Sequence, residues 1–220
     1  TYTVTIAAAA QCLDFTASAG FPTFTMNQTL QVAGNFNLTG STPTWSASTF
    51  GLFFQNSTLS ATRTVNSAGV TIDCPVTVSD NVASTVRLVA NLTIGSTRTF
   101  TFSAGISGDV FDLNGYTLTC GVFDSSNAIT RTLAFGTTGK IVCQATGTCW
   151  NLATTTGLTV TGTSSVEMTY SGSTAMTVQL GSLSAANAIS FWFKAGTYNL
   201  SFGGSSARNF DFTGFGGSII

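Results

Sequence analysis

The sequence contains very little charge. Only 7% of its 220 residues are charged, with 7 Lys and Arg against 8 Asp and Glu, and there is no histidine. About a quarter of the residues are charged in an ordinary protein. So few basic residues cannot form the positive surface that nucleic-acid binding or a polybasic membrane anchor requires. Without imidazole, a Ser-His-Asp or Cys-His triad and a histidine-ligated metal site are excluded as well.

Long apolar runs are also missing. Residues 15–62 carry no charge, but Thr, Ser, Asn and Gly interrupt them, so no run of about 18 apolar residues predicts membrane insertion. Pro occurs only 3 times, whereas 43% of the residues are hydrophobic and 18 are Phe. We therefore expect a folded chain rather than a disordered linker. Because it starts at Thr1 without a signal-peptide pattern, we expect a fragment of a longer chain.

Thr and Ser are abundant, at 65 residues, and many alternate with apolar residues. This period of two is clear in residues 1–6, 97–102 and 116–120. Thr, Val, Ile and Phe favour strands, and the alternation turns one face inward. Turn signals such as Asn114-Gly115 separate the runs, and helical candidates are no longer than about one turn. The sequence predicts an all-β fold of many short strands.

Internal similarity distinguishes a solenoid from a closed sandwich. A Thr-Arg-Thr triplet recurs around Arg63, Arg98 and Arg131, at spacings of 35 and 33 residues, and Cys120 and Cys143 are 23 residues apart. A half-coil of roughly 11–12 residues, consisting of one strand and one turn, reconciles these spacings. We predict an irregular parallel β-helix (β-solenoid), with a β-sandwich or jelly roll as the alternative.

The composition suits stacked coils. Like residues then form ladders, with Thr and Asn outside and Val, Ile, Phe and Cys inside. Charge is disfavoured because a ladder repeats it about every 4.8 Å, and we expect the Arg residues of the triplets to point outward. The solenoid is predicted to be a single region, residues 1–220, with soft boundaries near 60 and 145.

Five segments of the sequence carry a family resemblance, namely CLDFTA (12–17), NLTIGSTRTF (91–100), FDLNGYTLTCG (111–121), SSNAITRTLAFG (125–136) and NFDFTGF (209–215). Together they resemble the Thr/Ser/Gly-rich β-solenoid repeat proteins of aquatic tailed bacteriophages. The resemblance implies a tail fibre, tailspike or virion surface appendage that assembles as a homotrimer and contacts neighbouring virion proteins. It carries over no catalytic signature.

From this we expect a non-enzymatic structural and adhesive module that forms a rigid shaft and attaches to a host surface, on the virion or outside the cell. One alternative is a self-assembling extracellular filament or surface-layer subunit built from sandwich domains. The other is a tailspike depolymerase that cleaves polysaccharide. We expect no cofactor, metal, nucleic-acid partner or membrane insertion.

Carboxylates are the only candidates for acid–base chemistry. The candidates for a depolymerase are Asp109, Asp112 and Asp124. Two of them would lie on neighbouring coils and form the catalytic carboxylate pair. We favour the interpretation that Asp112 and Asp124 form turns and that Glu167 is a solvated strand residue. Asp14 and Asp211, which occur in matching phrases, are expected to fix the edge of a coil or a turn.

Aromatic residues are the better candidates for ligand binding. If the two Phe residues of 191–193 face inward, Trp192 faces outward beside Lys194 and Tyr198 and forms a platform for a host cell-surface glycan. Trp150 is a further candidate. The alternative is burial of these rings in an interface or under a loop.

The five cysteines lack a Cys-x-x-Cys motif, which argues against structural zinc. Cys143 and Cys149, separated by six residues, are the candidate disulfide for a protein outside the cell. The alternative is free thiols buried as small apolar side chains.

Overall fold

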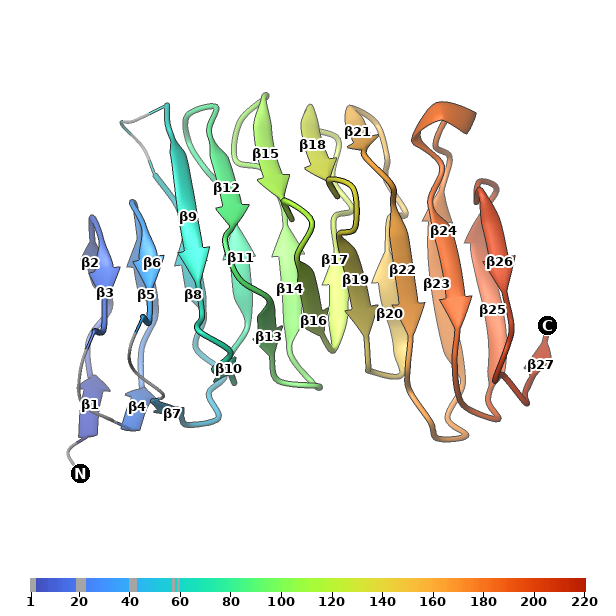
Figure 1. The fold of residues 1–220 in the computed structure, drawn as a ribbon, viewed down its shortest axis with the longest axis horizontal. Helices are drawn as coiled ribbons and strands as arrows, with labels where there is room; N and C mark the ends of the chain where they lie inside the picture. The colour runs from blue at the N-terminus through green and yellow to red at the C-terminus, as the bar shows by residue number, and fades with distance from the viewer. Residues whose placement is uncertain (1–2, 19–22, 40–42, 57, 59) are drawn as a thin grey trace.

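The computed structural model describes residues 3–18, 23–39, 43–56, 58 and 60–220. Over these residues the chain winds into a β-solenoid, in which successive coils stack along one axis (Figure 1). Through most of its length each coil contributes one strand to each of three sheets, which we call sheets I, II and III. The all-β solenoid predicted from the alternation is confirmed, and the sandwich alternative was wrong.

Sheet I runs through the whole solenoid, past residues 60 and 145. It consists of β2 (Ala10–Cys12), β5 (Leu30–Val32), β8 (Leu52–Phe54), β11 (Val76–Val78), β14 (Thr99–Phe102), β17 (Val122–Asp124), β20 (Gly147–Asn151), β23 (Met176–Gly181), β25 (Asn199–Gly204) and β27 (Ser218–Ile219). Sheet II consists of β3 (Phe15–Thr16), β6 (Phe36–Asn37), β9 (Thr62–Asn66), β12 (Thr85–Leu88), β15 (Asp109–Asp112), β18 (Arg131–Ala134) and β21 (Leu158–Thr161).

Sheet III consists of β10 (Thr71–Ile72), β13 (Leu92–Ile94), β16 (Thr117–Cys120), β19 (Lys140–Cys143), β22 (Ser165–Met168), β24 (Ser190–Phe193) and β26 (Asn209–Asp211). A three-stranded sheet takes its place in the first coils, with β1 (Thr3–Ile6), β4 (Thr23–Met26) and β7 (Thr44–Trp45). The single described helix, the 3-10 turn η1 (Ala185–Asn187), contacts β21. No described helix is long and apolar enough to cross a membrane.

The coils are irregular in length. Strands pair in parallel, and register partners lie between 19 residues apart, as for Asn199 and Ser218, and 29 apart, as for Phe36 and Val65. The 23-residue spacing of Cys120 and Cys143 is one coil, because the two residues are register partners. The half-coil scheme was wrong, since a full coil holds three strands. The triplets of Arg63 and Arg131 lie on sheet II, whereas Arg98 directly precedes β14 of sheet I.

Alternating burial builds one continuous core. Along sheet I, the register places inward side chains directly above one another, namely Leu52, Val76, Phe100, Phe123 and Trp150. The Phe100 and Phe123 rings stack with centroids 6.0 Å apart, and those of Phe123 and Trp150 with centroids 4.6 Å apart. The intervening Thr residues face outward and are half-buried by their own ladder neighbours. The predicted inside and outside ladders are confirmed.

Two of the triplet arginines do not point outward. Arg63 is 3% exposed and Arg131 is 1% exposed, and both lie within the first two residues of a strand of sheet II, at the corner where the chain arrives from sheet I. Arg131 donates to the carbonyl oxygens of Asn127 and Ile129, at 2.9 Å each, and to the hydroxyl of Ser125. Burial lowers the pKa of Arg131 to about 10. The expectation that these arginines point outward was therefore wrong, because loop carbonyl oxygens satisfy the Arg131 guanidinium inside the corner.

Candidate functional site

The outer face of sheet III changes character toward the C-terminus. In register order, one outward ladder begins with Thr71, Thr93 and Thr119 and continues with Val142, Glu167, Trp192 and Asp211. The adjacent outward ladder runs through Thr117, Lys140, Ser165, Ser190 and Asn209. The last coils therefore replace a threonine surface with an aromatic, charged and amide-bearing one.

Glu167 is held between two lysines from neighbouring strands. Lys140 Nζ lies 3.1 Å and Lys194 Nζ 3.0 Å from its Oε1. Burial by itself raises the pKa of Glu167, but the hydrogen bonds from Lys194 and Lys140 outweigh burial and hold the pKa below its ordinary value. Glu167 is 5% exposed, so the expectation of a solvated strand residue was wrong. Glu167 is an ionised anchor that fixes the position of Lys194.

Trp192 stands beside this ion-pair network and is 41% exposed. Lys194 Nζ lies 4.5 Å from the indole centroid, in cation–π geometry. The indole Nε1–H donates to Asp211 Oδ2 on the next coil. The backbone N–H of Thr213 donates to Asp211 Oδ1 at 2.8 Å, and the hydrogen bonds from Thr213 lower the pKa of Asp211. The ring is thereby fixed upright on the sheet.

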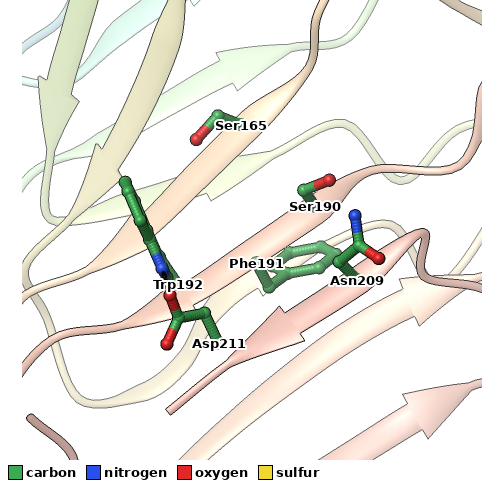
Figure 2. A pocket seen from close by; sticks show the side chains of 6 residues that line it. All are labelled: Ser165, Ser190, Phe191, Trp192, Asn209 and Asp211. Atoms are coloured by element: carbon green, nitrogen blue, oxygen red, sulfur yellow. Dashed lines mark hydrogen bonds between the residues drawn. The ribbon is translucent and has the colours of Figure 1, made fainter. Parts of the chain in front are cut away.

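A shallow pocket of about 230 Å³ opens at the foot of Trp192 (Figure 2). Its lining comes from three neighbouring strands of sheet III, β22, β24 and β26, and consists of Ser165, Ser190, Phe191, Trp192, Asn209 and Asp211. Figure 2 shows the indole and Asp211 on one side of this group and the Ser190 and Asn209 side chains on the other. Asp211 is the one charged side chain among these six residues. The pocket offers an aromatic wall with hydroxyl, amide and carboxylate groups within one small area.

Only part of the predicted aromatic platform lies at this site. Trp192 faces outward beside Lys194, as expected, whereas Trp150 and Tyr198 are both 0% exposed. Trp150 belongs to the inward ladder of sheet I and its ring also meets Phe191 edge-on, with centroids 5.7 Å apart. Burial raises the pKa of Tyr198 to about 12. Placing Tyr198 and Trp150 in the ligand site was therefore wrong.

The candidate disulfide is not formed. All five cysteines are free thiols, and Cys143 stacks in register on Cys120 while the Cys149 Sγ lies 3.5 Å from Met168 Sδ. Burial raises the pKa of Cys143 and of Cys149 well above the ordinary value. These residues pack as small apolar groups, which is the alternative that the sequence left open.

The carboxylates proposed for hydrolysis are dispersed. Asp112 lies on sheet II and pairs with Arg87 at 2.7 Å, whereas Asp124 lies on sheet I. Each accepts a backbone N–H two residues ahead, from Asn114 and from Ser126, so both form turns as expected. The cross-coil pairing that a depolymerase site would need does not occur between them.

Asp14 fixes the edge of a coil, as expected, by accepting the backbone N–H of Asn35. Within the described residues, no group of three or more metal-ligating side chains could hold a metal ion.

A buried cluster that was not predicted from the sequence lies at the corner between sheets I and II. Asp80 and Asp109 are both 0% exposed, and Asp80 Oδ2 accepts hydrogen bonds from Arg63 and Ser84. Asp109 Oδ2 accepts the backbone N–H groups of Asp80 and Gly105. Burial, reinforced by the charge of Asp80, raises the pKa of Asp109 to about 6. Alternation does place Asp109 and Arg63 on the inward face, and that is the signal that could have identified them.

No protein-family model, curated protein or solved structure matches the chain.

Proposed function

We propose that this chain is a non-enzymatic structural and adhesive module of a phage tail fibre, tailspike or virion appendage. The observation that carries the proposal is the unbroken ten-stranded ladder of sheet I, combined with an outer surface that departs from threonine at the Trp192 pocket. A continuous core with stacked aromatic rings makes a stiff shaft. The resemblance of the sequence to phage repeat proteins supports the location on a virion or outside the cell.

Attachment of the module to a host surface depends on the position of the Trp192 pocket and on the number of copies of the chain. The strands that carry the lining of the Trp192 pocket, β22, β24 and β26, lie toward the C-terminal end of the stack of coils (Figure 1). As a homotrimer beside other virion proteins, the module presents three such pockets to one cell surface, and multivalency raises a weak individual affinity. Asp112 and Asp124 form turns, and Asp80 and Asp109 are both 0% exposed, which favours binding over hydrolysis. The filament alternative rested on sandwich domains, and the fold found here is different.

Binding to bacterial surface polysaccharides tests the proposal. The purified chain is applied to immobilised capsular polysaccharide and lipopolysaccharide from aquatic bacteria, while released reducing ends are assayed. We expect retention on at least one polysaccharide without reducing ends. Release of reducing ends that disappears in Asp112→Asn would establish the depolymerase instead. Failure to bind any surface, with assembly into filaments, would support the filament subunit.

A further inference from the structure

The Trp192 pocket has the composition of a site for one sugar ring. At about 230 Å³ it is smaller than the roughly 300–1,000 Å³ of sites for drug-sized ligands. Lys194 covers part of the indole but does not line the pocket, so the pocket meets a part of the ring that Lys194 leaves free. An upright indole presents a flat apolar surface, and the C–H face of a pyranose is its natural complement.

The polar groups around the indole are available to a ligand. The side chains of Ser165, Ser190 and Asn209 make no hydrogen bond to other described residues. Elsewhere on the solenoid, outward hydroxyls pair across coils, as Thr177 Oγ1 does with Ser201 Oγ at 2.9 Å. Two hydroxyls and an amide provide both donors and acceptors, and these match the alternating hydroxyls on the edge of a sugar.

Charge selects among sugars. The sole charged group in the lining is the Asp211 carboxylate, whose pKa is lowered, so it is ionised at neutral pH. A carboxylate accepts hydrogen bonds from sugar hydroxyls but repels a uronic acid or a sulfated ring. Both lysines nearby are engaged with Glu167, and neither lines the pocket.

We infer that the pocket bounded by Trp192, Ser190, Asn209 and Asp211 binds a single neutral pyranose ring, stacked on the indole and hydrogen-bonded along one edge. This inference rests on the proposed adhesive function and names the class of sugar that the pocket binds. The neutral ring would be a terminal or side-chain residue of a surface polysaccharide, because the shallow outer face accommodates one ring and leaves its neighbours in solvent.

Trp192 provides its own probe. The other two tryptophans are buried, with Trp45 6% and Trp150 0% exposed, so sugar-dependent changes in indole fluorescence report on Trp192. The protein is titrated with the methyl glycosides of glucose, galactose and mannose, with N-acetylglucosamine and with methyl glucuronoside. At least one neutral sugar is expected to saturate with a millimolar dissociation constant. Methyl glucuronoside is expected to bind roughly tenfold more weakly.

Substituted proteins distinguish a loss of sugar binding from a loss of the fold. Sugar affinity is followed by saturation-transfer NMR, and folding is followed by thermal melting. Trp192→Ala and Asn209→Ala are each expected to weaken binding by about tenfold or more while the fold persists. Trp45→Phe, an aromatic replacement away from the pocket, serves as the matched control and keeps full affinity. Unchanged binding in Trp192→Ala, or tighter binding of the uronic acid than of every neutral sugar, overturns the inference.

Two further outcomes distinguish this inference from the proposed function. If no neutral sugar binds but the chain still adheres to polysaccharides, the pocket assignment fails and the adhesive function survives. If a neutral sugar binds but no polysaccharide surface retains the chain, the pocket stands and the proposed adhesive function fails. A third outcome also overturns the inference. If acrylamide quenches Trp192 fluorescence only after dilution, and if Trp192→Ala dissociates an oligomer, the pocket is an interface between copies of the chain.

Discussion

Replacing Asp109 with Asn is expected to stabilise the protein at neutral pH. Arg63, Asp80 and Asp109 form a buried cluster with one more negative than positive charge when all three are ionised. Asp109 Oδ1 has no hydrogen-bond partner among the described residues, so nothing compensates the negative charge at that oxygen. The Asn side chain preserves the acceptor for the N–H groups of Asp80 and Gly105 and removes the uncompensated charge.

The size of the effect follows from the pKa of Asp109, which rises from 3.8 to about 6. A shift of about two units corresponds to about 3 kcal/mol. Because the folded protein binds this proton more tightly than the unfolded chain, the free energy of unfolding decreases as the pH rises between these two values. Below the pKa of Asp109 in the unfolded chain, its carboxyl is protonated and does not destabilise the fold. Above the pKa in the folded protein, the destabilisation by its charge is complete. Burial also raises the pKa of Asp80, which acts in the same direction.

Guanidinium unfolding from about pH 4 to pH 8 measures this dependence. The Asp109→Asn variant should be more stable than the wild type by up to about 3 kcal/mol at neutral pH, and its advantage should vanish near pH 4. Asp112→Asn is the matched control, because its carboxylate pairs with Arg87 at the surface and should change stability by less than about 1 kcal/mol. A destabilised Asp109→Asn protein at neutral pH, or a stability gain that does not depend on pH, would contradict this prediction.

Three further predictions address the core, the turns and the thiols. Trp150→Ala removes a fully buried ring and should cost about 3–5 kcal/mol of unfolding free energy in guanidinium titrations. Gly162 and Gly69 have similar φ angles of +83° and +80°. A Cβ added to Gly162 would lie 2.3 Å from the Gly136 carbonyl oxygen, whereas a Cβ added to Gly69 would meet no atom within 4 Å beyond its chain neighbours. Gly162→Ala should therefore lower the melting temperature far more than Gly69→Ala; equal losses would contradict this. In the native protein, mass spectrometry should find iodoacetamide on the partly exposed Cys12, and on the other four thiols only after unfolding.

The sequence predicted the architecture because alternation and stacking act locally. The period of two assigns each strand residue to one face, and parallel stacking of similar coils then aligns Phe100 with Phe123 without further information. Coil length could not be predicted, because loops vary between strands and a spacing such as that of Arg63 and Arg98 crosses from one sheet to another. The spacing of two similar residues equals the length of one coil only where both occupy the same register position, as Cys120 and Cys143 do.

The candidate site was only partly predictable, for the same reason. The outward position of Trp192 follows from alternation within residues 191–193. The inward position of Trp150 follows a register shift in β20 between Thr148 and Trp150, at which alternation breaks. The pocket itself depends on which residues of β22 and β26 flank Trp192, and this requires the exact lengths of two coils.

Electrostatics were misjudged where the coil turns a corner. The charge of an Arg favours solvent, but alternation puts Arg63 and Arg131 on the inward face. The closed corner between sheets I and II then surrounds Arg131 with carbonyl oxygens and sets Arg63 against Asp80. On the open faces, opposite charges from adjacent coils pair, as Arg87 does with Asp112. Charge is therefore scarce in this solenoid because each charged residue needs a partner from the neighbouring coil or loop.

The decisive measurement is a crystal structure of the chain soaked with the neutral methyl glycoside that binds best. We expect one pyranose ring stacked on Trp192, with its hydroxyls hydrogen-bonded to Asp211 and to Ser190 or Asn209, on an otherwise unchanged stack of parallel coils. A sugar bound elsewhere, or a Trp192 face covered by another copy of the chain, would contradict this expectation.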